Sequence, residues 1–466
     1  MSTNKITVTE LGTKPVRALL LQYAVPAIIA MTASSLYNMI DSIFIGQGVG
    51  AMAISGLALT FPLMNLAAAF GSLVGMGAST IISLRLGQRD YASAQKILGN
   101  VVVLNLIIGL LFGGVVLAFL DPILYFFGAS ANTISYARDY MQIILVGNVI
   151  THMFMGMNAI LRAAGHPRRS MAATINTVVI NTILDPIFIY GLDWGIRGAA
   201  IATILAQLIS LAWQVYIFSD KRELLHFKRG IYRLERKIVG NIFSIGMAPF
   251  MMNFAACLVI IFINKGLKQY GGDLNVGAYG IVNRIIFVFV MIVMGINQGM
   301  QPIAGYNFGA KEYGRVKQVL KLTLIGATCV TTAGFVLGLF FPRMAVGAFT
   351  HDEELIELAV RGMRIVVVVF PIVGIQMVTS NFFQSIGMPL KAMFLSLSRQ
   401  VVFLLPALIL LPIAFTRYTE LDGSWGVWCA MPLSDLLATI VAVLLLTKQM
   451  KSFNAQYRDR CKASKF

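Results

Sequence analysis

The chain has 466 residues, of which 58% are hydrophobic and only 12% are charged. A soluble domain carries roughly 45–50% apolar and about 25% charged residues, so this composition excludes a soluble protein and indicates an integral membrane protein. The net charge of +17 would suit a nucleic-acid-binding protein. The distribution of the charges argues against that function, because the Lys and Arg residues gather in short segments between long apolar runs.

Twelve apolar runs follow one another along the chain, each long enough to cross a bilayer as a helix of about 20 residues. We expect transmembrane helices near residues 19–45, 56–83, 97–119, 137–161, 170–191, 198–218, 242–264, 277–302, 319–341, 358–383, 393–415 and 427–447. The sequence therefore predicts an all-α integral membrane protein with twelve transmembrane helices.

The basic residues predict how these helices are oriented. Most of the 37 Lys and Arg residues lie in the two terminal tails and in the loops that follow even-numbered spans. By the positive-inside rule this distribution places both termini in the cytoplasm. The richest loop, KRELLHFKRGIYRLERK at 221–237, joins spans six and seven. It either lies along the anionic inner leaflet or serves only to fix the topology.

The two halves of the sequence resemble each other. At one constant offset Gly87 pairs with Gly309 and Pro167 with Pro389, and LGQRDYASAQKIL aligns with FGAKEYGRVKQVL. Each half holds six spans, an even number, so the halves are parallel repeats, an arrangement typical of transporters. The predicted parts are an N-tail (1–18), an N-lobe of spans one to six (19–218), a basic linker (219–241), a C-lobe of spans seven to twelve (242–447) and a C-tail (448–466).

Two aspartates interrupt apolar spans of the first half. Asp41 lies in span one, and Asp185 lies in INTILDPIFIY of span five, directly before Pro186. Their counterparts in the second half are Asn264 and Ala407. An ionised carboxylate in hydrocarbon costs at least ~2.5–3.5 kcal/mol, so it persists only where it is paired, protonated or in contact with water. We therefore predict a proton or ion relay that belongs to the N-lobe of a transporter.

Several segments resemble the multidrug and toxic compound extrusion (MATE) transporters. They are PAIIAMTASSLYNMIDSIFIG in span one, AILRAAGHPRRSM between spans four and five, NTILDPIFIYGLDWGIRGAAIATILAQ across spans five and six, and GINQGMQPIAGYNFGAKEYGRV in the second half. The resemblance covers nearly the whole chain. It favours the prokaryotic DinF-like branch over the NorM-like branch, because spans seven, eight and ten carry no acidic residue at the positions the NorM-like pattern requires.

This resemblance implies a V-shaped pair of six-helix lobes in the plasma (inner) membrane of a prokaryote. It implies export of small-molecule drugs or organic cations against proton or sodium entry, with membrane lipids as the other partner and no cofactor. The cation-coupling residues it implies are Asp41, Asn181, Asp185 and Thr203.

The chemistry of these residues suits a coupling site. Asn181 and Asp185 are four residues apart and so share one helical face. Removal of carboxyl groups from water favours their protonated form, and two close carboxyl groups share protons as a coupled unit. Amide and hydroxyl groups bond to either protonation state. We favour the proton as the coupling ion, although the same oxygens suit Na⁺.

Polar or amphipathic groups on N-lobe spans are the predicted substrate-binding residues: Tyr37, Asn38, Tyr140 and Asn158. Pro26 and Pro186 lack a backbone donor, and we expect them to act as hinges in the spans that carry the two aspartates. In the C-lobe, Arg284 and Asp435 could pair, either as a structural salt bridge or as a second coupling site.

Other function classes have less support. A lipid or lipid-linked sugar flippase with the same duplicated lobes would favour a basic central cavity, and interior Lys or Arg is scarce here. An enzyme would need a catalytic or metal motif, and neither HExxH nor GxSxG occurs. A channel gives no reason for carboxylates in one lobe only. We predict a transporter without a bound metal, and the two halves make a self-sufficient monomer plausible.

Overall fold

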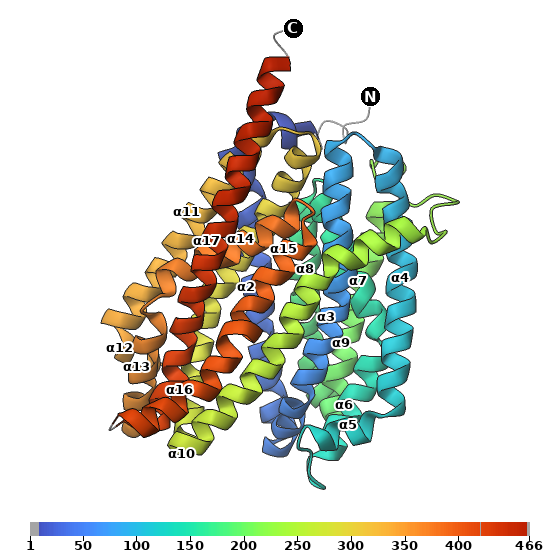
Figure 1. Ribbon diagram of the computed structural model, residues 1–466. Helices are drawn as coiled ribbons and strands as arrows, with labels where there is room; N and C mark the ends of the chain where they lie inside the picture. Colours follow the sequence, from blue (N-terminus) through green and yellow to red (C-terminus); the bar gives the residue numbers. More distant parts are fainter. Residues whose placement is uncertain (1–8, 420, 464–466) are drawn as a thin grey trace. The chain divides into compact units, whose positions relative to one another are not determined.

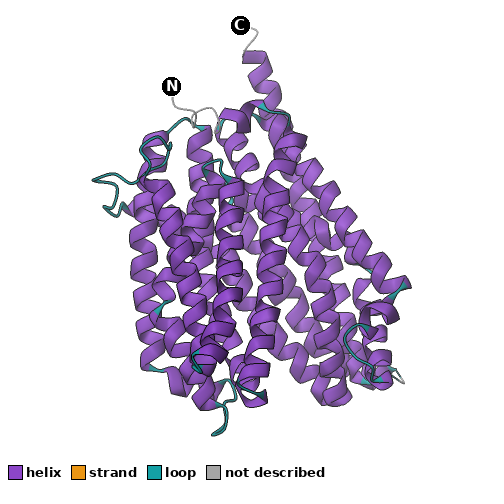
Figure 2. Ribbon diagram, turned by 180° about the vertical axis from the view of Figure 1, so that it is seen from behind, coloured by secondary structure: helices purple, strands orange, loops and turns teal. Residues whose placement is uncertain are grey.

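The computed structural model describes residues 9–419 and 421–463, apart from the side chains at positions 38, 39, 51, 273 and 454–463. This part of the chain consists of α-helices, two π-helical turns and connecting loops, without a strand (Figure 2).

The elements follow the predicted spans closely (Figure 1). They are α2 (Val16–Gly48), α3 (Ala51–Gly87), α4 (Tyr91–Ala118), α5 (Leu120–Phe126), α6 (Ile134–Val146), α7 (Asn148–Ala163), α8 (Pro167–Pro186), η1 (Ile187–Gly191), α9 (Gly195–Ser219), α10 (Arg236–Gly309), α11 (Tyr313–Phe340), α12 (Pro342–Gly347), α13 (Glu353–Val367), α14 (Phe370–Ser385), α15 (Pro389–Leu397), η2 (Ser398–Leu404), α16 (Leu405–Tyr418) and α17 (Gly423–Ala463). Within the described residues, ten helices are long and apolar enough to cross a membrane, or up to twelve if each of two bent pairs is one span. The all-α membrane fold predicted from the sequence is confirmed.

The two bent pairs are α6 with α7, bent by 55°, and α13 with α14, bent by 56°. The first bend lies at Gly147, where a Cβ atom would lie 2.5 Å from the Ile204 side chain. The second precedes Pro371, whose ring would clash with the carbonyl group of Val367, the last residue of α13. The spans predicted at 137–161 and 358–383 therefore exist, but each is broken in its middle.

The described helices fall into two compact units. Unit 1 comprises Met1–Lys14 and Ile29–Phe250, and unit 2 comprises Pro15–Ile28 and Met251–Phe466. The chain passes from unit 2 into unit 1 within α2 and returns to unit 2 within α10. Each unit therefore contains the first part of a span whose remainder belongs to the other.

Small residues allow these helix ends to pack closely, and they do so in the same way in each unit. In unit 2 a Cβ atom on Gly299 would lie 2.6 Å from the backbone of Ala24, and in unit 1 one on Gly77 would lie 3.2 Å from the backbone nitrogen of Gly246. The two contacts are related by the offset that also pairs Gly87 with Gly309. The internal duplication therefore extends to the packing of individual backbone atoms.

The basic linker between the halves is docked on unit 1. The Gln95 side chain on α4 bonds to both backbone groups of His226. Asn100, also on α4, donates to the Arg233 carbonyl at 3.1 Å and accepts from the Glu235 N–H at 3.0 Å. Two polar side chains of one helix thus satisfy backbone groups of an irregular segment, and this holds the linker in a defined path.

Candidate functional site

The two aspartates of the apolar spans meet inside unit 1. Asp41 on α2 is 6% exposed, and Asp185 near the end of α8 is fully buried. Their carboxyl groups lie close enough to interact directly. Two carboxyl groups this close can share a proton as a coupled unit.

Asn181 and Thr203 complete the cluster. Asn181 Nδ2, one helical turn from Asp185, donates to Asp185 Oδ1 at 3.2 Å and to Thr203 Oγ1 at 3.4 Å. The Thr203 hydroxyl on α9 donates to the Ala199 carbonyl at 3.0 Å. Since its only hydrogen is used there, the hydroxyl group of Tyr37, 3.0 Å from Thr203 Oγ1, must be the donor in that contact. Side chains from α2, α8 and α9 thus form one connected network.

Three oxygen atoms of this network lack a donor. Within the described residues, Asp41 Oδ1, Asn181 Oδ1 and Asp185 Oδ2 are buried and have no hydrogen-bond partner. Buried acceptors without a donor are costly, and native proteins keep few of them. Oxygen atoms alone suit a proton, or a hard cation such as Na⁺, and the residues fit either as transported ion. The described residues contain no group of three or more His, Cys, Asp or Glu side chains suited to a resident metal ion.

Tyr140 lies beside the network, on α6. Its side chain is 1% exposed and lies near Thr203. The ring packs in a hydrophobic cluster with Ile45, Leu57 and Ile189. Of the tyrosines predicted to bind substrate, Tyr37 therefore contacts the predicted cation site through Thr203, and Tyr140 lies next to it.

Three arginines of unit 1, at the ends of its spans, could have paired with the buried aspartates, but each binds other groups. Arg138 forms a bidentate pair with Asp121 at 2.7 and 2.6 Å, and Arg197 pairs with Asp139 at 2.9 Å. Arg162 donates to the side chains of Asn158 and Ser170. Among the described residues no basic side chain forms an ion pair with either buried aspartate, so a salt bridge does not explain why the carboxyl groups are there.

Asn158 lies apart from the other predicted substrate-binding residues. It donates to Thr174 Oγ1 at 2.9 Å, and its Oδ1 accepts from Arg162 Nη1 at 3.1 Å and from the Ser170 hydroxyl. Thr174 precedes Asn181 by seven residues on α8, about 10 Å along the helix axis. Asn158 therefore belongs to a second polar network at the start of α8. The Asn38 side chain, also predicted to bind substrate, lies outside the described residues.

The two predicted hinge prolines lie in α2 and α8, the helices that carry the aspartates. Pro186 directly follows Asp185 and ends α8, and the chain continues as the π-helical turn η1. A proline removes one backbone donor, and a π-helical turn is often associated with function. Pro26 lies inside α2, within the part of this helix that belongs to unit 2, whereas Asp41 lies in the part that belongs to unit 1. Hinge action of both remains a prediction.

In unit 2 the partner of Asp435 differs from the predicted one. Arg399 Nε donates to Asp435 Oδ1 at 2.5 Å. The predicted span at 393–415 already includes Arg399. In the structure this span begins at Pro389, and Arg399 lies in its third turn, in the π-helical segment η2. Pairing Arg284 with Asp435 was wrong, because the sequence pattern does not show which helix faces meet.

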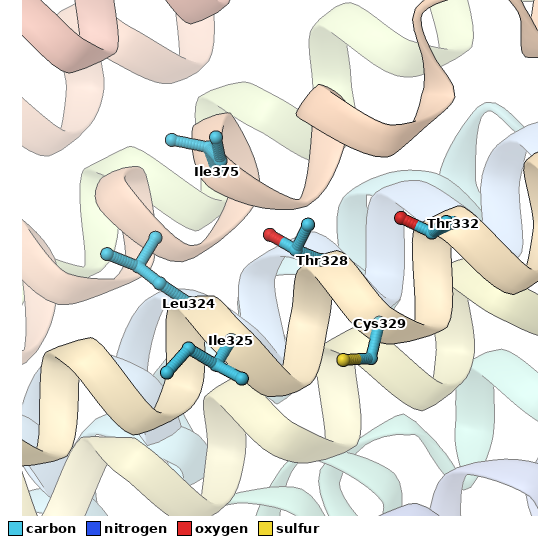
Figure 3. A pocket seen from close by; sticks show the side chains of 6 residues that line it. All are labelled: Leu324, Ile325, Thr328, Cys329, Thr332 and Ile375. Carbon is cyan, nitrogen blue, oxygen red and sulfur yellow. The ribbon is translucent and has the colours of Figure 1, made fainter.

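A second feature of unit 2 is a hollow of about 540 Å³ along α11. Figure 3 shows its walls: Leu324, Ile325, Thr328, Cys329 and Thr332 follow one another on α11, with Ile375 of α14 opposite them. It carries no charged group. A mostly apolar hollow of this kind suits contact with lipid chains, and the hydroxyl groups of Thr328 and Thr332 are its polar groups.

The comparison with known proteins identifies the family. The MatE family model matches residues 26–187 and 238–409, one segment in each half of the chain. The chain belongs to the MATE family. Among its relatives is the Multidrug export protein MepA of Staphylococcus haemolyticus, with 26% identity over 427 residues, 92% of each chain.

Solved MATE structures share the whole fold. A crystal structure of MATE in the bent conformation superimposes with a TM-score of 0.90 at 23% identity, over 98% of this MATE chain and 99% of the other. A second solved chain, described only as protein A, gives a TM-score of 0.87 at 34% identity, over 97% and 98% of the two chains. The predicted family is confirmed, whereas assignment to its DinF-like branch stays a prediction.

Proposed function

We propose that this MATE protein is a multidrug efflux transporter that exports amphipathic or cationic compounds in exchange for a cation bound by Asp41, Asn181, Asp185 and Thr203. The family and the MepA relatives support multidrug export. The observation that carries the coupling proposal is the buried contact between the carboxyl groups of Asp41 and Asp185, without a basic partner among the described residues. A site that holds an exchangeable positive charge explains why two such groups persist in apolar helices.

The proton fits this site better than sodium. A proton shared by the two carboxyl groups is favoured, because its loss would place two negative charges side by side in apolar surroundings. Na⁺ would instead require several oxygen atoms to converge on one point, and the carboxyl groups would have to separate for it. Sodium remains the competing outcome of the experiment below.

The proposed cycle links the site to helix α2. With the site open to the outside, proton uptake by the aspartate pair removes its attraction for a cationic substrate, and α2 bends at Pro26 as the compound leaves. Tyr37, which is linked to the pair through Thr203 and Asn181, responds to the change in charge. With the site open to the cytoplasm, proton release restores the negative charge, and a new cation binds. A crystal structure of a MATE protein in a bent conformation supports bending as part of this cycle.

The location proposed is the plasma membrane of a prokaryote, with both termini in the cytoplasm. The bacterial relatives and the positive-inside distribution of the basic residues support it. We assign the transport lobes to residues 19–218 and 242–447, joined by the linker 219–241 that docks on α4.

The test is flux of a fluorescent monovalent organic cation in proteoliposomes, driven separately by a pH gradient and by a sodium gradient. We expect the pH gradient to drive accumulation in the wild type and to fail in both Asp185→Asn and Asp41→Asn. The matched control is Asp121→Asn, which removes an exposed carboxylate of the same unit. Undiminished pH-driven accumulation in both aspartate variants would overturn the proposal. Accumulation driven by sodium alone would replace the proton with Na⁺.

A further inference from the structure

Unit 2 contains a cavity that none of the functions above uses. It has a volume of about 340 Å³ and lies among α10, α14, η2 and α17. Much of its wall is soft and apolar, with five methionines: Met252, Met291, Met294, Met377 and Met431. A volume of ~300–1,000 Å³, apolar walls and a few polar groups are typical of small-molecule sites. Methionine side chains adapt to ligands of different shape.

The charged groups of the cavity lie together, whereas α10 contributes uncharged polar groups, Asn253 and Asn283. Arg399 and Gln400 come from η2, and Asp435 comes from α17. Arg399 Nε and Asp435 Oδ1 are 2.5 Å apart, with Asp435 9% and Arg399 29% exposed at the side chain. This bond engages one nitrogen of the guanidinium group and one oxygen of the carboxylate. The pair therefore offers further donors and a further acceptor side by side.

Gln400 provides a second independent indication of a ligand. Its side chain is 9% exposed, and its Oε1 is buried without a hydrogen-bond partner among the described residues. The π-helical turn η2 places it next to Arg399 on the wall of the cavity. Turns of this kind widen a helix by one residue and occur often at functional sites. A ligand that donates a hydrogen bond would satisfy this acceptor.

We propose that this cavity is a second substrate-binding site, selective for zwitterionic amphipathic molecules, with Arg399 and Asp435 as the residues that determine its charge selectivity. A zwitterion places its anionic group against the free nitrogen atoms of Arg399 and its cationic group against the free oxygen of Asp435. Its apolar body packs against the methionines, and the internal ion pair stays intact.

Singly charged molecules are disfavoured at the same place. A cation at the free oxygen of Asp435 would add a positive charge beside the Arg399 guanidinium without an anion to balance it, and an anion at Arg399 would add an unbalanced negative charge beside Asp435. An uncompensated charge in a partly buried position is unfavourable. The ion pair thus excludes the cations that the aspartate site of unit 1 attracts, and selectivity arises from what the site rejects.

The test uses two dyes that differ by one ester. Rhodamine 110 carries a free carboxylate and is zwitterionic, and rhodamine 123 is its methyl ester and is cationic. Binding of each to the purified full-length protein is measured by fluorescence anisotropy in an Asp41→Asn/Asp185→Asn background, so that the proposed coupling site does not contribute. With no substitution in unit 2, we expect the protein to bind rhodamine 110 with higher affinity than rhodamine 123. Failure of the coupling proposal would leave this result unchanged, because the cavity does not depend on the two aspartates.

Substitutions should reverse the preference. In Arg399→Gln the affinity for rhodamine 110 should fall by about tenfold or more while that for rhodamine 123 rises, because Asp435 is then unpaired. In Asp435→Asn the cavity should instead gain affinity for the anionic dye fluorescein. The control Arg343→Gln breaks an exposed ion pair of unit 2 and should change none of these affinities.

A double variant keeps the test decisive if the single variants fail to fold. Arg399→Gln/Asp435→Asn removes both charges together, which a protein tolerates better than the loss of one partner. It should lose rhodamine 110 binding by about tenfold or more. Unchanged rhodamine 110 affinity in a folded, monodisperse double variant would overturn the proposal, as would equal affinity of the wild-type cavity for the two dyes.

Discussion

At the scale of single residues, the sequence determines which side chains share a helix face but not which faces meet. Asn181 and Asp185 were predicted to lie together because they are one turn apart, and the structure joins them to Thr203 and Asp41 on two other helices. Asn158 was predicted to bind substrate as a polar group on an N-lobe span. It lies with Ser170 instead, because its position along α7, and not its chemistry, decides its neighbours.

A substitution at Tyr140 tests whether the site depends on side chains next to the four predicted coupling residues. Tyr140→Phe removes a buried hydroxyl group that lies near Thr203 and leaves the ring in the hydrophobic cluster. We expect the variant to be destabilised by at most roughly 1 kcal/mol, the typical net contribution of one buried hydrogen bond, and to transport more slowly. Thermal unfolding in detergent and cation flux measure the two effects. Tyr216→Phe is the control, since that side chain is 76% exposed, and an equal effect there would show that Tyr140 has no special role.

At the scale of elements, the sequence patterns predicted the helices but not the bends within them or the contacts between them. Apolar runs gave the helices, but the bends at Gly147 and before Pro371 follow from single residues inside those runs. The docking of the linker on α4 depends on Gln95 and Asn100, two polar residues in a helix that otherwise reads as a plain apolar span. Such residues become interpretable only when the segment they bind is known.

The contact between α3 and the first part of α10 gives a prediction of this kind. A Cβ atom on Gly246 would collide with the backbone carbonyl of Leu73, whereas one on Gly240, two turns earlier on α10, meets nothing within 4 Å. We expect Gly246→Ala to destabilise unit 1 by about 1–3 kcal/mol, because the backbones must separate. Gly240→Ala should be neutral or stabilise the helix by roughly 1 kcal/mol. Comparable melting temperatures of the two variants in detergent would contradict this packing argument.

The docked linker should respond to pH through His166. Its Nε2 lies 2.9 Å from Glu223 Oε2, and Arg169 contacts the other oxygen at 2.5 Å. Burial lowers the pKa of His166 below its ordinary value of 6.5, with Arg169 acting in the same direction and the Glu223 carboxylate opposing it. The unfolded chain therefore binds more protons than the docked one near pH 6, so docking weakens as the pH falls through this range.

Hydrogen exchange measures this effect directly. Protection of the backbone amides at 223–228 should be lower at about pH 5.5 than at about pH 7.5, after correction for the intrinsic exchange rate. In His166→Gln the difference should largely disappear, because the titrating group is gone. Arg169→Gln provides the matched control, since it removes a partner of Glu223 that does not titrate in this range. An unchanged pH dependence in His166→Gln would assign it to another group.

At the scale of the whole molecule, the two halves share their helix packing but differ in their charged residues. The contact of Gly77 with Gly246 in unit 1 repeats that of Gly299 with Ala24 in unit 2. The charged groups do not repeat, because unit 1 holds a pair of carboxyl groups and unit 2 holds an ion pair of zero net charge. The predicted halves, derived from matching glycines and prolines, could reveal the common framework. They could not reveal the ion pair, since the position in the first half that corresponds to Arg399 carries no charge.

The stoichiometry of exchange follows from the shared proton of the aspartate pair. If one proton is exchanged for one monovalent cation, no net charge crosses the membrane, and one pH unit, about 1.36 kcal/mol, sustains at most a tenfold gradient of the compound. A second proton would couple transport to the membrane potential, worth about 2.3 kcal/mol per charge or roughly fiftyfold per 100 mV, in addition to its own share of the pH gradient. Asp41 and Asp185 interact directly, and because two close carboxyl groups share protons as a coupled unit, we expect one-for-one exchange. Steady-state accumulation in proteoliposomes should then be the same with and without a potassium diffusion potential imposed by valinomycin, at a fixed pH gradient. A large increase with potential would mean that each aspartate carries its own proton.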